Sequence, residues 1–455
     1  MTKQEAAIKY ITENYLQFNR LRYDVVAEKL QVRTPSNSPF GGGGLTTGGG
    51  GGTEHWRELS KHDINSIVCH AAQEYDTNIT SREVMTALHS DLIPHVHPLR
   101  EYILSLRPYT PDQPDWIDFV ASQVKTLPTP PYRGGDINGI RHSPSEGEME
   151  GVGGDREDCQ LWRTCFKKWF VAMVASWMKD EVVNHQVLVL IGKQGIYKTT
   201  WLEHLIPPHL RAYACKLANS NELNKDERLR IAEFGLISLD EIDSMNNREL
   251  NQLKSIITSS DVNERAAYAY SKERRIRLAS FCASGNRREF LTDLTGNRRW
   301  LPFEVESIQN PFYTTLPYEQ MYAEAWTLAQ DPTFSYWFEL DEIEVLERHN
   351  QYFRDESNEE QLLNVYFAIP ATDAINAKFL TTAEISEKLV SAGNIKRPMT
   401  LNRLGMLLRQ KGFTANRQGC PARRGWIVYE RDSEEINAER KLFARSKLAD
   451  LADLF

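Results

Sequence analysis

The chain of 455 residues has no long apolar run, no paired cysteines and no excess of positive charge. No stretch approaches the roughly 20 apolar residues that a membrane-spanning helix needs, so we expect no membrane partner. The six cysteines form no C-x-x-C pair and the N-terminus has no apolar signal-peptide core, which predicts reduced thiols and a cytoplasmic location. With 54 basic and 62 acidic residues the net charge is −8, so any nucleic-acid surface has to be local.

Two segments have the composition of connections rather than of packed structure. Residues 38–53 are mostly glycine, and residues 129–158 are rich in Pro, Gly, Ser and acidic side chains, so neither can bury a core. A chain of this length suggests about three domains. We therefore expect a mostly helical N-terminal domain at 1–128 with a Gly-rich loop at 38–53, a linker at 129–158, a core domain with a helical lid at 159–345, a helical connector at 346–375, and a last compact unit with a tail at 376–455.

Hydrophobic periodicity predicts the elements on either side of the linker. Before it, 19–33 alternates like a hairpin, and helical periodicity runs through 64–75, 81–93 and 116–127. After it, 161–180 reads as a helix, and three continuous apolar segments read as buried parallel strands: 187–191, 234–243 and 276–286. Strands separated by helices predict an α/β fold that binds its ligands at the carboxyl ends of the strands.

The segment 187–200, VLVLIGKQGIYKTT, is the most informative one, because an apolar strand breaks into a glycine-containing loop ending in Lys-Thr-Thr. Gly192, Gly195, Lys198, Thr199 and Thr200 fit the Walker A pattern G-x-x-x-x-G-K-[ST] and are the predicted nucleotide-binding residues. In such a loop, backbone N–H groups and the helix N-terminus bind polyphosphate, the lysine reaches the β and γ phosphates, and the first threonine holds Mg²⁺. Hydrolysis of ATP with Mg²⁺ is therefore the first hypothesis.

Tyr197 departs from this pattern, because it occupies the place of the second glycine. The missing side chain of that glycine normally lets the backbone approach the phosphates closely. A tyrosine that points outward can be tolerated there; the alternative is that a tyrosine at this position weakens ATP affinity. This residue also keeps open a third hypothesis, a nucleotide-binding protein without turnover.

A pair of carboxylates, Asp240 and Glu241, directly follows the apolar strand LISL in a Walker B arrangement. Asp240 is expected to hold Mg²⁺ together with Thr199, and Glu241 to polarise the attacking water. The alternative is an ordinary surface Asp-Glu pair. The preceding buried strand and the distance of about forty residues from the phosphate loop favour the catalytic interpretation.

Asn286 and an arginine pair complete the predicted catalytic residues. Asn286 ends the strand FCASGN, where its amide can orient water or sense the γ-phosphate; alternatively it caps a turn with Gly285. Arg298 and Arg299 lie in a turn before another strand, where a guanidinium can act as an arginine finger on a neighbouring subunit. The alternative for both arginines is a structural ion pair or a surface charge.

Two basic regions are candidates for nucleic-acid contacts. Lys272, Arg274 and Arg275 follow two tyrosines in a predicted hairpin that can bind single strands, although a solvated turn is equally compatible. Near the C-terminus, helices at 381–393 and 400–412 precede a hairpin at 413–430, an order that suggests a winged helix. Its basic residues include Arg417, Arg423 and Arg424. DNA binding and protein contact both remain open for this unit.

With GKQGIYKTT, LISLDEID, the ASGN strand end and TGNRRWLPFEV in this order, the chain resembles the virulence-associated protein E family of P-loop ATPases, which are similar to superfamily 3 helicases. The resemblance covers roughly residues 60–345. It implies an AAA+-like P-loop core, a winged-helix extension, ATP and Mg²⁺ as ligands, a ring-forming homo-oligomer, and a role in the replication of phages and mobile elements. It assigns the Walker A, Walker B, sensor and finger roles to the residues named above. The chain shows no amino-terminal block with the paired acidic or metal-binding motifs of a fused primase, so priming, if it is required, is expected to come from a separate primase.

Two functions from different classes follow from these motifs. The first is an ATP-hydrolysing DNA helicase or translocase that acts on single-stranded or forked DNA. The second is an ATP-switched replication initiator or regulator that binds DNA without unwinding it. Measured unwinding of a forked duplex separates the two.

Overall fold

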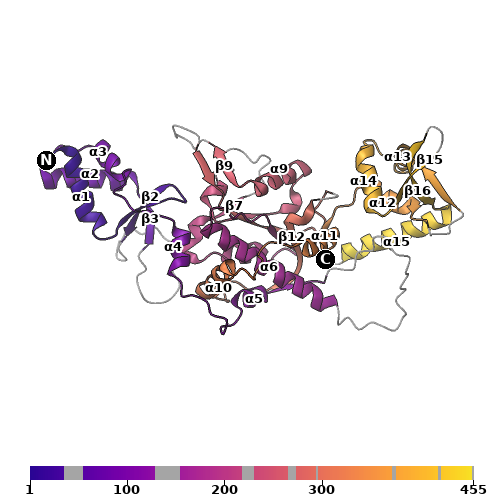
Figure 1. The fold of residues 1–455 in the computed structure, drawn as a ribbon, viewed down its shortest axis with the longest axis horizontal. Helices are drawn as coiled ribbons and strands as arrows, with labels where there is room; N and C mark the ends of the chain where they lie inside the picture. Colours follow the sequence, from indigo (N-terminus) through magenta and orange to yellow (C-terminus); the bar gives the residue numbers. More distant parts are fainter. Residues whose placement is uncertain are drawn as a thin grey trace.

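The computed structural model describes residues 1–34, 55–128, 154–217, 230–264, 273–293, 296–370, 376–418 and 422–452. The architecture is mixed α/β, as predicted, and an N-terminal region, a central sheet and a C-terminal unit follow one another along the long axis (Figure 1). The glycine-rich segment 38–53 lies outside the described residues, as does most of the expected linker. The last residues of that linker, 154–158, already belong to a long helix, α6 (Gly154–Met178).

The N-terminal region combines helices with a small sheet of strand order β3-β2-β1-β4. The expected hairpin at 19–33 is confirmed, since β1 and β2 pair antiparallel with Leu21 opposite Val32. The other strands show that this region is less helical than the periodicity suggested. Its elements are α1 (Lys3–Ile11), η1 (Thr12–Leu16), β1 (Leu21–Asp24), β2 (Lys29–Thr34), β3 (His55–Glu58), α2 (Lys61–Tyr75), α3 (Ser81–Leu88) and β4 (His95–Val96).

A six-stranded sheet forms the centre of the molecule. In spatial order its strands are β5 (Val124–Thr126), β12 (Trp300–Ile308), β6 (Val187–Ile191), β11 (Ser280–Gly285), β8 (Leu236–Leu239) and β7 (Ala214–Leu217). The strands from β12 to β7 are parallel to their neighbours, and β5 joins β12 antiparallel. Every residue of β6, β8 and β11 is buried, so the continuous apolar segments do form parallel strands.

Strand β5 corrects the helix expected over 116–127. The helix α5 (Trp116–Ala121) ends early, and Val124 pairs with Ile308 of β12 instead of continuing it. The β-branched side chains of Val124 and Thr126 favour the extended form once an edge of the sheet is available. The hydrophobic core also includes side chains of α4 (Pro98–Ser105) and α5, so it does not break at the boundary expected near residue 128.

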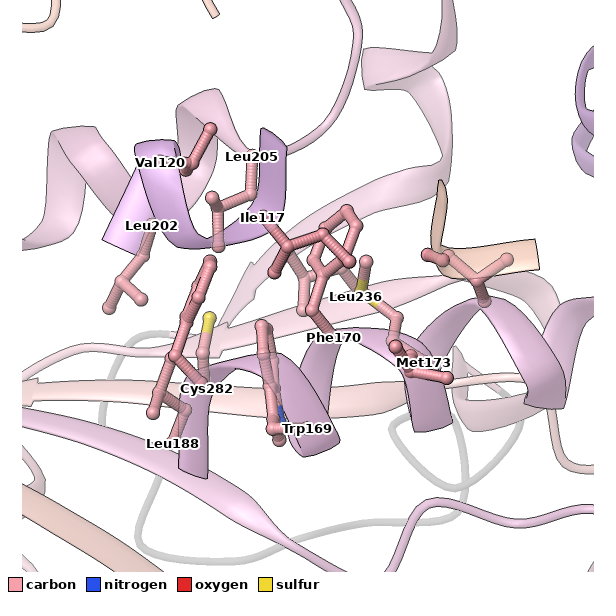
Figure 2. Close-up of a cluster of buried hydrophobic side chains, with 14 of the residues drawn as sticks. Ile117, Val120, Trp169, Phe170, Met173, Leu188, Leu202, Leu205, Leu236 and Cys282 are labelled. Carbon is pink, nitrogen blue, oxygen red and sulfur yellow. The ribbon is translucent and has the colours of Figure 1, made fainter. Parts of the chain in front are cut away.

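Helix α6 is the main support of one face of the sheet. Its tryptophans Trp162, Trp169 and Trp177 are fully buried, and their indole N–H groups donate to the carbonyls of Ala121 (2.9 Å), Phe281 (3.0 Å) and Gly235 (3.1 Å). Figure 2 shows side chains of this helix gathered with others from α5, from the region of α7 (Lys198–His204) and from the sheet. Each such large apolar side chain contributes roughly 1.5–3 kcal/mol by burial, so these contacts fix the sheet against the helix.

The remaining central elements include helices that cover the sheet and a separate two-stranded sheet. Leu250, Leu253 and Ile257 of α9 pack on the face opposite α6. These elements are α7 (Lys198–His204), η2 (Pro208–Tyr213), η3 (Ile242–Ser244), α9 (Asn247–Thr258), β9 (Asp261–Glu264), β10 (Glu273–Ile276), η4 (Asn297–Arg299), α10 (Tyr318–Gln330), α11 (Leu340–Asn350) and η5 (Gln351–Phe353). The strand expected over 276–286 is interrupted, because β10 ends at Ile276 and the buried Arg277 donates to backbone carbonyls before β11 begins.

The C-terminal unit has its own hydrophobic core, formed by residues such as Leu363, Leu389, Leu404 and Trp426. The two helices and the hairpin expected there are confirmed, with β15 and β16 paired antiparallel. The elements are α12 (Asn358–Tyr366), β13 (Phe367–Ala368), β14 (Ala377–Leu380), α13 (Thr382–Gly393), α14 (Leu401–Gln410), β15 (Thr414–Gln418), β16 (Arg423–Glu430) and α15 (Ser433–Ala452). Across the described ranges of the whole chain, no helix has the length and apolar character needed to cross a membrane.

Candidate functional site

The loop between β6 and α7 lies at the carboxyl end of the parallel strands, as predicted. Its two glycines are required by its shape. Gly192 has a φ of 157°, and a Cβ there would lie 2.6 Å from the carbonyl oxygen of Val305. Gly195 has a φ of 86°, a left-handed conformation that L side chains rarely adopt.

Lys198, the first residue of α7, folds its side chain back into this loop. It is 6% exposed, and its ammonium donates to the carbonyls of Gly192 (2.7 Å) and Lys193 (2.6 Å) and to Oδ1 of Asn286 (3.3 Å). Burial lowers the pKa of Lys198, while Asp243 and Asp240 oppose that shift. The loop therefore holds a positive charge at its centre, and the oxygens that accept hydrogen bonds from this ammonium are all uncharged.

Thr199, Asp240 and Ser284 form a compact polar cluster beside the loop. Oδ1 of Asp240 accepts from the hydroxyls of Thr199 (3.2 Å) and Ser284 (2.8 Å), and the two hydroxyl oxygens are 2.8 Å apart. The three residues come from α7, the end of β8 and β11. The sheet thus brings the two residues predicted to share Mg²⁺ into direct contact.

The other carboxylate oxygen of Asp240 is held by Lys216, which lies on β7 at 2.6 Å. Burial favours the neutral carboxyl, but the hydrogen bonds from Lys216 and Ser284 outweigh it, so the pKa of Asp240 lies below its ordinary value. The same contact raises the pKa of Lys216. Asp240 is therefore an anion with a cation already beside it.

Two further carboxylates follow Asp240. Glu241 is exposed and has a left-handed backbone (φ 52°, ψ 48°) that starts the short helix η3. Asp243 accepts from the backbone N–H groups of Asn286 (3.2 Å) and Arg287 (3.1 Å). The loop after β8 therefore fixes the end of β11, and the side chain of Asn286 is left to reach Lys198.

Tyr197 points outward from the loop. It has a left-handed backbone (φ 69°, ψ 17°), the conformation that a glycine supplies without strain. Its hydroxyl accepts from Nδ2 of Asn310 (3.3 Å), and its ring lies edge-on to Phe312. This is the outward orientation that the sequence analysis considered for Tyr197. Thr200 follows Lys198 and Thr199 on α7, and its carbonyl oxygen lies 2.7 Å from Nδ1 of His204.

Arg298 and Arg299 lie at the opposite end of the sheet. They form η4, directly before β12, whose first residue Trp300 pairs with Val187 at the start of β6. At ~3.3 Å per residue, β6 places the phosphate loop about 13 Å further along the sheet. Arg298 is exposed and Arg299 is half-buried. These two side chains are therefore remote from the loop of their own chain.

The two predicted nucleic-acid regions differ in exposure. Lys272 lies outside the described residues, and of Arg274 the structure describes the backbone, paired with Asn263 in the β9–β10 hairpin. Arg275 is not a free surface charge, since its guanidinium pairs with Glu28 (2.5 Å) and Glu233 (3.1 Å). The sequence pattern predicted Arg275 as a nucleic-acid contact without these two partners, because both glutamates are far from it in the sequence.

Arg417, Arg423 and Arg424, by contrast, are exposed on the β15–β16 hairpin. Arg417 lies directly opposite Arg424 in the antiparallel ladder. Like charges in directly opposite positions repel each other, so this pair destabilises the hairpin unless an anion lies beside it.

Ser284 and Lys216 are among the residues of the site that sequence reasoning missed. Ser284 had a usable signal, since residues two apart on a strand share a face and it precedes Asn286 by two. Lys216 had none, because β7 is a short strand with mixed burial.

The donor set at this site suits Mg²⁺. No cluster of three or more His, Cys, Asp or Glu side chains that could hold a metal occurs among the residues the structure describes. Mg²⁺ does not need one, because it usually takes one or two protein oxygens and completes its shell with water and phosphate oxygens. The hydroxyl of Thr199 and the carboxylate of Asp240 are hard oxygen donors in contact, so these residues fit that ion.

Comparison with known proteins adds one family match. The model of the virulence-associated protein E-like domain matches residues 153–355, which contain β6, β8, β11 and the loop. No curated protein matches the chain. Similar solved structures include the apo structure of the NrS-1 C terminal region (TM-score 0.44, 10% identity, 94% of this chain and 100% of that one) and its A form (TM-score 0.44, 9% identity, 93% and 99%).

Proposed function

We propose that the protein is an ATP-hydrolysing DNA helicase or translocase that acts in the replication of a phage or mobile genetic element. The observation that carries this proposal is the meeting of Lys198, Thr199, Asp240 and Asn286 at one edge of a parallel sheet. The match to a virulence-associated protein E-like domain over 153–355 supports the association with mobile elements.

The same geometry suggests how each residue acts on ATP. The backbone N–H groups of the loop and the N-terminus of α7 bind the phosphates, and Lys198 exchanges the carbonyls of Gly192 and Lys193 for phosphate oxygens. Thr199 and Asp240 would hold Mg²⁺, which neutralises the charge that develops on the phosphates. The side chain of Asn286 accepts a hydrogen bond from Lys198, so Asn286 can respond to the γ-phosphate.

Glu241 is the proposed general base. It directly follows Asp240 at the carboxyl end of β8 and is exposed to the solvent from which the attacking water comes. Phosphoryl transfer depends mainly on positioning and on electrostatic stabilisation, so a carboxylate that orients water is sufficient there. Glu241 has a left-handed backbone, which is strained for a residue other than glycine. Such strained conformations are found mainly at functional sites.

We further propose that the central region is a P-loop core related to superfamily 3 helicases and that the C-terminal unit is a winged helix. The strand order β12-β6-β11-β8-β7, with the nucleotide loop after the second of these strands, supports the first assignment. The succession of α13, α14 and the β15–β16 hairpin supports the second.

The proposed DNA contacts are the exposed arginines Arg417, Arg423 and Arg424, together with Lys272 and Arg274 of the other hairpin. We leave Arg275 out, because two carboxylates already neutralise it. A variant with Arg417, Arg423 and Arg424 changed to Ala should bind single-stranded DNA with a log–log salt slope less steep by about 2, from about 0.7 for each lost phosphate contact. An unchanged slope would remove this surface from the proposal.

The proposed active form is a ring of identical subunits, in which Arg298 or Arg299 reaches the ATP of a neighbour. Their place at the far end of the sheet from their own loop supports action in trans. Where priming is required, we assign it to a separate primase.

The decisive experiment compares ATP turnover with and without single-stranded DNA for the wild type, Lys198→Ala and Lys125→Ala. Loss of the buried ammonium should lower DNA-stimulated turnover by about 100-fold. Lys125 lies in the same sheet, but its side chain is 69% exposed, so its removal should leave turnover unchanged. Equal turnover in wild type and Lys198→Ala would overturn the proposal.

A second candidate function is an ATP-switched replication initiator or regulator. The observation that favours it is the compact C-terminal unit with its exposed arginine hairpin, which suits duplex binding as well as tracking along a strand. It predicts specific duplex binding without strand separation under hydrolysing conditions. Unwinding of a forked duplex by the wild type, and none by Lys198→Ala, would reject this candidate in favour of the first.

A further inference from the structure

An exposed aromatic group lies directly beside the phosphate loop. Tyr197, Phe312 and Tyr313 are 38%, 69% and 89% exposed. Single exposed aromatic residues are common on protein surfaces, but a cluster of them beside a polar site is a usual mark of ligand binding. We call these three residues the aromatic shelf.

The shelf is an ordered structure, because one asparagine organises the turn that carries it. Oδ1 of Asn310 accepts from the backbone N–H of Phe312 (3.0 Å). The backbone carbonyl of Asn310 accepts from the backbone N–H groups of Tyr313 (3.1 Å) and Thr314 (3.2 Å). The side-chain amide of the same Asn310 donates to the hydroxyl of Tyr197 (3.3 Å). The turn after β12 is therefore attached to the phosphate loop.

Phe312 lies along helix α7. Its ring is edge-on to Tyr197, with centroids 6.4 Å apart, and to His204, with centroids 5.6 Å apart. Tyr197 and His204 lie at the two ends of α7, which the helix rise separates by about 10 Å. The shelf thus begins where the phosphates are expected to bind and extends away from them along the helix.

We propose that the aromatic shelf binds the base of the nucleotide whose phosphates lie on the loop, with Phe312 and Tyr197 as stacking surfaces that favour a purine. This inference rests on the proposed function and deepens it by naming what selects the nucleotide. A base is joined to its phosphates through one ribose, and the shelf is the aromatic surface that starts at the residue next to Lys198.

The conformation of Tyr197 supports this assignment. Its left-handed backbone turns the side chain out of the loop and toward Phe312, so the phosphates and the ring do not compete for space. A non-glycine residue in this conformation is strained, and such strain persists mainly at functional sites. A stacked base gives the ring a role that a glycine cannot supply.

The chemistry also predicts a preference among nucleotides. Stacking is tolerant of base identity because every base has a π face, and its strength increases with the area of that face. A purine has two fused rings, so the shelf should bind ATP and GTP more tightly than CTP and UTP.

The test separates base binding from phosphate binding by using ATP and inorganic tripolyphosphate, each with Mg²⁺. Phe312→Ala should weaken ATP binding by about tenfold, the equivalent of about 1.4 kcal/mol, and leave tripolyphosphate binding unchanged. Phe312→Trp should restore ATP binding, because indole also stacks. Phe18→Ala is the matched control, since Phe18 is 63% exposed and precedes β1 in the N-terminal region.

The outcomes distinguish this inference from the proposed function. If Phe312→Ala and wild type bind ATP equally, or if purine and pyrimidine nucleotides bind equally to wild type, the inference is wrong and the proposed function stands. If wild type binds neither ATP nor tripolyphosphate, both fail. If Phe312→Ala weakens single-stranded DNA binding or self-association without nucleotide and leaves ATP binding intact, the shelf serves another partner and the inference is overturned.

Discussion

The polar side chains at the two ends of the central sheet differ in whether they form hydrogen bonds with other side chains. At the carboxyl end, Lys198, Asp240 and Asn286 are joined to one another or to their neighbours by hydrogen bonds. At the amino end, the carbonyls of Arg298 and Arg299 lie 2.9 and 3.1 Å from the side-chain amide of Gln186. Among the described residues, no hydrogen bond or ion pair joins the guanidinium of Arg298 or Arg299 to another side chain.

This difference indicates which chemical parts one chain supplies to its own site. The carboxyl end offers the loop proposed to bind phosphates, a buried ammonium, oxygen donors that suit Mg²⁺ and the carboxylate proposed to orient water. Phosphoryl transfer is also accelerated by a guanidinium that stabilises the transition state, and such a group can come from a neighbouring subunit. The amino end holds two guanidinium groups for which the described residues show no side-chain partner.

The strongest test of this comparison removes both arginines. The double variant Arg298→Ala, Arg299→Ala should hydrolyse ATP about 10³-fold more slowly and bind ATP as the wild type does, because a finger acts mainly on the transition state. Mixing it with Lys198→Ala protein should restore part of the activity, since a mixed ring has sites with an intact loop and an intact finger. Steady-state ATPase across mixing ratios measures this. Absence of rescue at every ratio would count against action in trans.

The next largest effect is expected at the carboxyl end. Asp240→Asn keeps the shape of the side chain but removes the charge that is paired with Lys216 and suited to Mg²⁺. Turnover should fall by about 100-fold. Asp331→Asn is the control, because Asp331 is an exposed carboxylate in a turn after α10. Similar turnover for Asp240→Asn and wild type would show that this carboxylate is not part of the metal site.

A smaller effect of opposite sign is expected at Lys216. Its ammonium lies 2.6 Å from Oδ2 of Asp240 and therefore competes with Mg²⁺ for that oxygen. Lys216→Met should lower the Mg²⁺ concentration for half-maximal ATPase severalfold, because removal of a nearby like charge favours the cation. A titration of ATPase activity against Mg²⁺ measures it. A higher Mg²⁺ requirement would mean that Lys216 positions the carboxylate instead of competing for it.

The carboxyl end of the sheet is the part of the molecule that the sequence predicts well. Its features are local: a continuous apolar strand predicts a buried parallel strand, and the residues that follow Ile191, Leu239 and Gly285 share one edge wherever such strands align. Helix and hairpin order in the C-terminal unit is local in the same way. The family model matches residues 153–355, the segment that contains these three strands.

The features that the sequence did not predict depend on contacts between residues far apart in the chain. Val124 forms a strand because Ile308 offers an edge 184 positions later, and no periodicity within 116–127 contains that information. Arg275 is neutralised by Glu28, which precedes it by 247 positions. Lys216 becomes part of the site through the register of β7 against β8. Basic residues in a sequence therefore do not establish a basic surface.

The smallest expected effect concerns the strain that the carboxyl end retains at Tyr197. A left-handed backbone costs a non-glycine residue roughly 1–2 kcal/mol, and Tyr197→Gly removes this cost. The glycine variant is destabilised in turn by the larger entropy of its unfolded chain, ~0.5–1 kcal/mol, and by loss of the ring contacts. Urea unfolding of Tyr197→Gly should therefore give a free energy close to that of the wild type. Tyr197→Ala keeps the strain without the contacts, so it should be about 1 kcal/mol less stable than Tyr197→Gly. If the alanine variant is the more stable one, the loop does not hold this residue in a left-handed conformation in solution, and the outward orientation of the tyrosine needs another cause.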